Sequence, residues 1–232
     1  MEGPFAWLSL ADCGGLAGPL IMRKKISLVS DIPFHLCART NERTDFGPPL
    51  HVVWSHMENY LYFIHHAYGV RIHSFVLMPN HFHLIARFPN GNLGPAMNYF
   101  MRETSKAIAR DAGRENHIWG TRVFRSLIRS PHYFSHAYKY VYRNPVEANL
   151  SKRVEEYFFS TLPCLLGMKH GLIPLEADDY LFEDLEAQLE WLNHSPAEAD
   201  KAAIKAALRR SEFSIPRERA TQKANLLEVV RY

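Results

Sequence analysis

One stretch, Ser74–Arg87 (SFVLMPNHFHLIAR), constrains the fold more than any other part of the chain. Its two apolar runs, Phe75–Met78 and Leu84–Ala86, have the length and composition of buried strands. Pro79 and Asn80 lie between the runs, and this residue pair favours a turn. The stretch therefore predicts two neighbouring strands.

Two histidines, separated by one bulky residue, follow the turn. Side chains alternate between the faces of a strand, so His81 and His83 should share one face while Phe82 points to the other. Two imidazoles on one face of a rigid strand are suited to bind a metal ion. The chain has 13 histidines, however, and imidazoles are often satisfied in protein cores, so the spacing alone leaves a packing role open.

The surrounding sequence predicts strands and helices in a regular order. A strand is expected over 32–40 and a helix over 51–68, ended by Gly69; after the two strands come a helix over 96–111 and a strand over 122–128. This order predicts an α+β, ferredoxin-like βαββαβ fold, in which an antiparallel sheet carries both helices on one face.

A further helix is expected over 131–150, ending or kinking near Asn144 because the residue before a proline disfavours helical geometry. Residues 157–171 are expected to pack as an extension, and residues 178–210 to form amphipathic helices with leucines at positions 181, 185, 189 and 192.

Composition excludes several classes of protein. The 47% apolar content, the 22% charged content and the net charge of +3 are ordinary for a globular chain. No run of about 18 apolar residues is present, so no membrane span is expected. The three cysteines have no C-x-x-C spacing, which argues against a disulfide framework and favours a reducing cytoplasm.

The helix expected over 131–150 contains a second pair of chemical interest. Tyr140 and Asn144 are four residues apart and so project from one helical face. A phenol is a poor nucleophile at neutral pH unless a metal ion or cation stabilises the phenolate. An ion bound by His81, His83 and the Asn144 amide oxygen would polarise a phosphodiester; Mg²⁺ or Mn²⁺ suits such ligands. Tyrosines are crowded in this helix, so packing explains some of them.

Basic residues gather over 122–153, where Glu147 is the only acidic residue and aromatic residues that could stack on bases are interleaved. A solvated basic face would look the same. The candidate DNA contacts are Arg122, Arg125, Arg129, Lys139 and Arg143.

Two motifs, MPNHFHLI and YVYRNPVEANL, together resemble those of the HUH single-tyrosine transposases, and most of all the branch of REP-associated tyrosine transposases. The resemblance covers roughly residues 26–162. The family's histidine pair corresponds to His81 and His83, its nucleophile to Tyr140 and its third metal ligand to Asn144.

The resemblance implies divalent-metal-dependent cleavage of single-stranded DNA beside a hairpin, with a 5′-phosphotyrosine intermediate and a free 3′-hydroxyl. It also implies a monomer or a homodimer. Three regions are expected. Residues 1–21, rich in Gly, Pro, Ala and Leu, are a disordered extension, an upstream mis-start or an ordered arm; residues 22–153 are the transposase-like catalytic domain, and residues 154–232 a mainly helical extension. A domesticated protein that binds structured nucleic acid without cutting it, and a nuclease that uses a metal-bound water, remain alternatives.

Overall fold

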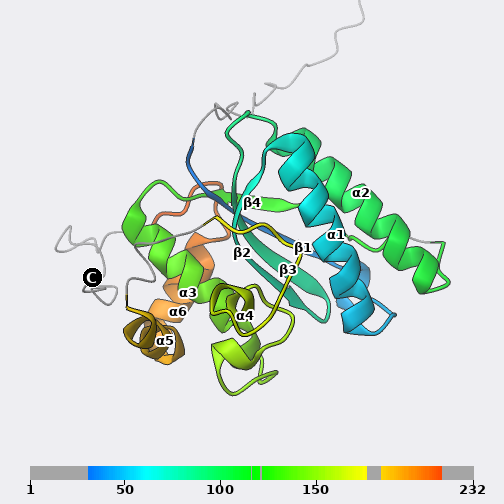
Figure 1. Cartoon of the computed structure of the whole chain (residues 1–232). Coiled ribbons are helices and arrows are strands. Elements are labelled where there is room, and N and C mark those ends of the chain that lie inside the picture. Colours follow the sequence, from blue (N-terminus) through cyan, green and yellow to red (C-terminus); the bar gives the residue numbers. More distant parts are fainter. Residues whose placement is uncertain (1–30, 116, 121, 177–183, 216–232) are drawn as a thin grey trace, which may run out of the picture.

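The computed structural model describes residues 31–115, 117–120, 122–176 and 184–215. Its first regular elements, apart from a 3₁₀ turn at Asn41–Arg43, are β1 (Phe34–Arg39), α1 (Leu50–Tyr68), β2 (Arg71–Met78), β3 (His81–Arg87), α2 (Leu93–Asp111) and β4 (Phe124–Leu127). The strands form an antiparallel sheet in the order β2-β3-β1-β4 (Figure 1). The ferredoxin-like fold predicted from the sequence is confirmed. The expectation for residues 1–21 concerns positions outside the described residues.

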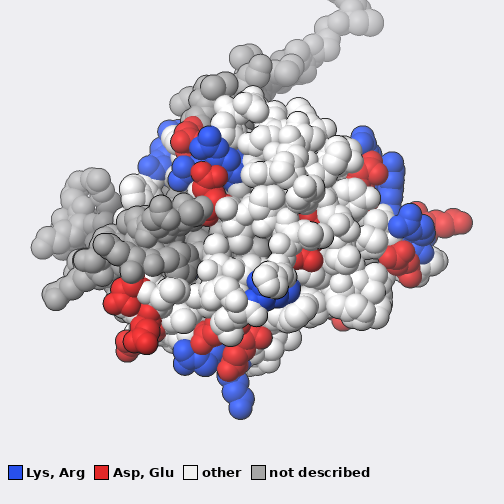
Figure 2. All heavy atoms as spheres, in the orientation of Figure 1, with Lys and Arg blue, Asp and Glu red and all other residues white. Residues whose placement is uncertain are grey.

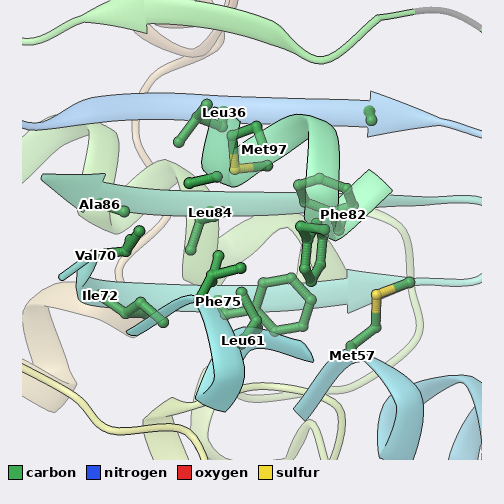
Figure 3. Packing of buried hydrophobic residues seen from close by; sticks show 14 of the residues in the cluster. Leu36, Met57, Leu61, Val70, Ile72, Phe75, Phe82, Leu84, Ala86 and Met97 are labelled. Carbon is green, nitrogen blue, oxygen red and sulfur yellow. The ribbon is translucent and has the colours of Figure 1, made fainter. Parts of the chain in front are cut away.

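Helices α1 and α2 cover one face of the sheet (Figure 1). The core between them is apolar, and Figure 3 shows Phe75, Phe82 and Leu84 of the strands packed beside Leu61 of α1 and Met97 of α2. Helix α1 ends, as predicted, at Gly69, whose φ of 68° is the left-handed conformation that glycine adopts without strain.

The opposite face of the sheet is covered by α3 (Pro131–Glu147) and by elements from the C-terminal part of the chain (Figure 1). These are a 3₁₀ turn at Val154–Glu156 and the helices α4 (Leu162–Leu165), α5 (Leu185–Asn193) and α6 (Glu198–Ala207). A second apolar core lies here, in which Val76, Met78 and Ile85 of the sheet meet residues of α3 and α6. The sheet is therefore buried on both faces.

Helix α3 begins where Ser130 accepts a hydrogen bond from the Tyr133 N–H, with a proline in the first turn. Of the two outcomes expected near Asn144, an end of the helix is wrong, because the helix continues through Pro145 to Glu147. Proline has no N–H to donate to the preceding turn. The carbonyl left without this donor is that of Val141, which lies 3.5 Å from the Asn144 side-chain amide. The same amide donates a shorter bond to the carbonyl of Tyr140 (2.6 Å).

Segments from the C-terminal part of the chain pair with both edges of the sheet. At the β2 edge, Leu77 N donates to Phe159 O (2.9 Å) and Thr161 N donates to Phe75 O (3.0 Å). At the β4 edge, Leu127 N donates to Ser211 O (3.0 Å) and Phe213 N donates to Leu127 O (2.8 Å). These segments are part of the same sheet structure.

Two expectations from composition can be compared with the described residues. No helix among them is long and apolar enough to cross a membrane. Cys37 and Cys164 are both free thiols, while Cys13 lies outside the described residues.

The Thr161 hydroxyl is a hydrogen-bonding centre at the β2 edge. It accepts from Phe75 N (2.9 Å) and lies 2.9 Å from the Tyr142 hydroxyl. Thr161→Val keeps the shape but removes the acceptor of a buried N–H, so we expect a loss of about 1–3 kcal/mol of unfolding free energy. Tyr142→Phe should cost only about 1 kcal/mol. Urea denaturation measures both, and equal stability of Thr161→Val and the unsubstituted chain would contradict the assignment.

Candidate functional site

Strand β3 directs His81 and His83 to the face of the sheet that α3 covers. Their partners in β1 are Arg39 and Cys37, and residues directly opposite in an antiparallel pair point to the same face. Phe82 points to the other face, where it packs at right angles to the Phe100 ring. The alternation predicted from the sequence is therefore present.

Helix α3 brings Tyr140 and Asn144 to the same place. The ring of Tyr140 lies 5.6 Å from the ring of His83 and perpendicular to it, and the rings of His81 and His83 are 5.1 Å apart. All four side chains line one cavity of about 380 Å³. The structure thus brings together the four residues singled out as nucleophile and metal ligands.

The tautomer of His81 is fixed by its neighbour. Asn80 donates its Nδ2 to the carbonyl of Arg43 (2.7 Å), which identifies its other side-chain atom as the oxygen. That oxygen lies 2.7 Å from His81 Nδ1 and can only accept, so His81 carries its proton on Nδ1. The lone pair of Nε2 is then available to a cation.

His83 is oriented by a residue that sequence reasoning missed. His35 of β1 places its Nε2 2.9 Å from His83 Nδ1, and both imidazoles are almost fully buried. If a cation binds His83 Nε2, the proton of this neutral imidazole must be on Nδ1. His83 Nδ1 then donates the hydrogen bond to His35 Nε2. His35 would then hold its own proton on Nδ1, which has no hydrogen-bond partner among the described residues. His35 can therefore accept the hydrogen bond that metal binding at His83 Nε2 requires.

The imidazoles of this site are neutral at neutral pH. Burial lowers the pKa of His35 and that of His81 from 6.5 to about 4, with the Arg39 charge adding to the effect at His81. Burial, together with His35, His81 and Arg39, holds the pKa of His83 well below 6.5. Neutral imidazole is the form that binds metal ions.

Tyr140 remains protonated in this structure. Burial raises the pKa of its phenol, and Cys37 raises it further. Arg209, Arg39 and a hydrogen bond from Asn144 lower this pKa but do not offset burial. Activation of the phenol therefore needs additional positive charge in the cavity.

The donor atoms around the cavity fit a divalent cation. His81 and His83 each offer Nε2, and Asn144 offers its amide oxygen because its Nδ2 donates to the Tyr140 carbonyl. Among the described residues no group of three His, Cys, Asp or Glu side chains is placed to bind a metal ion, and Asn144 is the amide that lines the cavity with the two histidines. Two nitrogens and one oxygen leave coordination positions open for substrate oxygens, as Mn²⁺ or Mg²⁺ would require.

The five candidate DNA contacts do not form one surface. Arg122 and Arg125 line a groove beside α2, and Arg129 forms an ion pair with Glu212 (2.9 Å). Lys139 and Arg143 are buried. The face shown in Figure 2 has basic side chains mixed with acidic ones around its rim and a largely uncharged centre.

The two buried cations have identifiable partners. Arg143 Nη1 donates to the carbonyls of Leu192 (3.1 Å) and Asn193 (2.6 Å) at the end of α5. The Lys139 ammonium lies 4.8 Å from the centre of the Trp191 ring. Both side chains are covered by α5, a contact that the local sequence pattern does not reveal. As the structure stands, neither is placed to contact DNA.

The low pKa values give a pH dependence with a definite sign. Below pH 6.5 the unfolded chain protonates His35, whereas the folded chain, with a pKa of about 4, does not. This contribution to stability is therefore complete above pH 6.5 and is lost as the pH falls toward 4, by about 1–2 kcal/mol between pH 7 and pH 5. His35→Gln, which cannot titrate, should reduce the pH dependence of urea unfolding by that amount.

The control for the effect of a histidine-to-glutamine substitution is His170→Gln, which replaces an exposed imidazole outside the cavity. Identical pH dependence of His35→Gln and the unsubstituted chain would show that His35 is not held neutral by the fold.

Two similar proteins can be compared with this chain. The REP-associated tyrosine transposase of Escherichia coli (strain K12) is 30% identical over 105 residues, which are 45% of this chain and 61% of that protein. The match thus spans about three fifths of the relative's length. A solved structure of the REP-associated tyrosine transposase bound to a REP hairpin has a TM-score of 0.49 and 20% identity, covering 63% of this chain and 87% of that one.

A family model described as "Transposase IS200 like" matches residues 28–144, half of the chain. The matched residues include the strand with His81 and His83 and end at Asn144, so the four predicted site residues His81, His83, Tyr140 and Asn144 lie within them. This chain belongs to the IS200-like transposase family.

Proposed function

We propose that this protein is a metal-dependent tyrosine transposase that cleaves and rejoins single-stranded DNA next to hairpins. One observation carries the proposal: Tyr140 shares a cavity with His81, His83 and Asn144, although strand β3 and helix α3 are far apart in the sequence. A phenol beside two neutral imidazoles and an amide oxygen is an arrangement suited to nucleophilic attack on a phosphodiester.

The reaction transfers a phosphoryl group without consuming a cofactor. Tyr140 Oη attacks the phosphorus atom, the new P–O bond forms, and the bond from phosphorus to the 3′ oxygen breaks. One proton passes, in net terms, from the phenol to that oxygen, leaving a 3′-hydroxyl and a 5′-phosphotyrosine. Attack of another 3′-hydroxyl on the phosphotyrosine reverses the step and joins two strands.

The residues of the cavity have separate roles in this proposal. His81, His83 and Asn144 would hold a divalent cation, which when bound would supply Lewis-acid activation of the scissile phosphate. Asn80 and His35 hold the two imidazoles in the orientation described above. The choice of single-stranded DNA beside a hairpin rests on family membership and on the resemblance of the two sequence motifs.

A second function, binding of structured nucleic acid without cleavage, is favoured by one feature. A groove of about 760 Å³ runs along α2 and is lined by Arg102, Lys106, Arg122 and Arg125, with Glu115 as the acidic residue. Its basic side chains could bind a phosphate backbone independently of the cavity around Tyr140.

An adduct assay separates the candidate functions. With end-labelled single-stranded hairpin DNA and Mn²⁺ or Mg²⁺, we expect a covalent protein–DNA adduct that disappears in Tyr140→Phe and without metal. Tyr142→Phe is the matched control, because the Tyr142 hydroxyl is buried against Thr161 and does not line the cavity.

Three other outcomes of the adduct assay would contradict the proposed function, each in a different way. Hairpin binding without any cleavage would favour the binding protein, and cleavage without an adduct would favour a nuclease that uses water. An adduct that persists in Tyr140→Phe but is lost in Tyr142→Phe would identify Tyr142 as the nucleophile.

Metal binding tests the role of His35 apart from activity. His83→Ala should abolish Mn²⁺ binding, and His35→Phe, which cannot accept the bond from His83 Nδ1, should weaken it by about tenfold or more. His35→Gln offers an amide oxygen and should retain most of the affinity. Electron paramagnetic resonance of free Mn²⁺ measures binding, with His170→Gln as control. Unchanged affinity of His35→Phe would remove His35 from the site.

A further inference from the structure

Part of the wall of the Tyr140 cavity comes from the C-terminal part of the chain. Lys205 of α6, and Leu208 and Arg209 directly after that helix, line the cavity together with the histidine pair and Tyr140. These residues lie outside the segment matched by the family model, which ends at residue 144. The cavity is therefore built from two parts of the chain, and only one of them carries the family's motifs.

Several contacts fix the position of this wall. Ile204, Ala207 and Leu208 are buried in the core on the α3 side of the sheet. Lys201 Nζ lies 2.9 Å from Glu147 Oε2 of α3. Beyond α6, the segment that follows pairs with Leu127 of β4, as described above. Helix α6 is thus attached to both α3 and β4, so the fold holds the backbone that carries Lys205 and Arg209 beside the cavity.

The cavity has an excess of positive charge. Its cations are Arg39, Lys205 and Arg209, and within the described part of the chain none of these side chains forms an ion pair or a hydrogen bond. The acidic residue of the cavity, Glu147, is already bonded to Arg143 (2.7 Å) and to Lys201. Arg209 is also close enough for its charge to favour the phenolate form of Tyr140.

Positive charge at this position matches the chemistry proposed for the site. A phosphodiester brings negatively charged oxygens to a phenol that must itself become negative, and nearby cations offset that repulsion. A guanidinium group is suited to bind phosphate oxygens in pairs, and an ammonium group binds them as a point charge.

We propose that Arg209 and Lys205 bind the phosphodiester backbone at the cleavage position, which makes α6 and the turn after it part of the DNA-binding site. This inference rests on the proposed function for its substrate, a single-stranded DNA. The chain segment after residue 144 then contributes directly to substrate binding, in addition to covering the sheet.

The test uses the full chain with Arg209→Gln, Lys205→Gln and the double substitution. Arg210→Gln is the matched control, since Arg210 is exposed, adjacent in sequence and absent from the cavity lining. All substituted side chains are exposed, and thermal unfolding checks that the variants keep the fold. Fluorescence anisotropy with a short single-stranded oligonucleotide, in EDTA to prevent cleavage, measures affinity against salt concentration.

We expect the slope of log affinity against log salt to fall by about 0.7 for each lost phosphate contact, hence by about 1.4 in the double variant. The rate of adduct formation with Mn²⁺ should fall by about tenfold or more in Arg209→Gln, whereas Arg210→Gln changes neither quantity.

The slope of log affinity against log salt concentration tests whether Arg209 and Lys205 bind phosphate. An unchanged slope in the double variant overturns it, whatever happens to the adduct. If the unsubstituted chain forms no adduct but the slope falls as expected, the proposed cleavage reaction fails while phosphate binding by α6 is supported.

Discussion

In β3, Phe82 and Leu84 are buried against α1 and α2, while His81 and His83 face α3. Because side chains alternate along a strand, a shift of one residue in the pairing of β3 would place both imidazoles in the apolar core. Phe82 opposes such a shift through ring contacts with Phe75, Phe100 and Trp119. The apolar packing on one face of the sheet therefore determines the geometry of the polar site on the other.

The parts of the site that could be predicted from the sequence depend on local periodicity. Alternation along a strand places His81 and His83 on one face, and a four-residue step along a helix does the same for Tyr140 and Asn144. The element order and the resemblance to a family indicated that these two pairs lie close together, and in the structure they line one cavity. Their chemical roles remain predictions until the adduct and metal-binding assays are done.

The site residues that could not be predicted from the sequence depend on contacts between distant segments. His35 and Arg39 could be placed in the site only once β1 was known to pair with β3, and Arg209 only once α6 was known to pack on α3. The same reason explains why Lys139 and Arg143 looked like surface cations. Their local sequence is basic, but α5 covers them from a region some fifty positions further along the chain.

The covered sheet edges have a consequence for how this molecule can associate. An exposed strand edge is a template for adding a strand from another molecule. Here β2 is bonded along its outer side at Ile72, Phe75 and Leu77, and β4 at Leu127, in each case by the same polypeptide. Continuing the sheet into a second copy would first require these chain segments to detach, so the fold opposes the edge-to-edge addition of strands from other molecules.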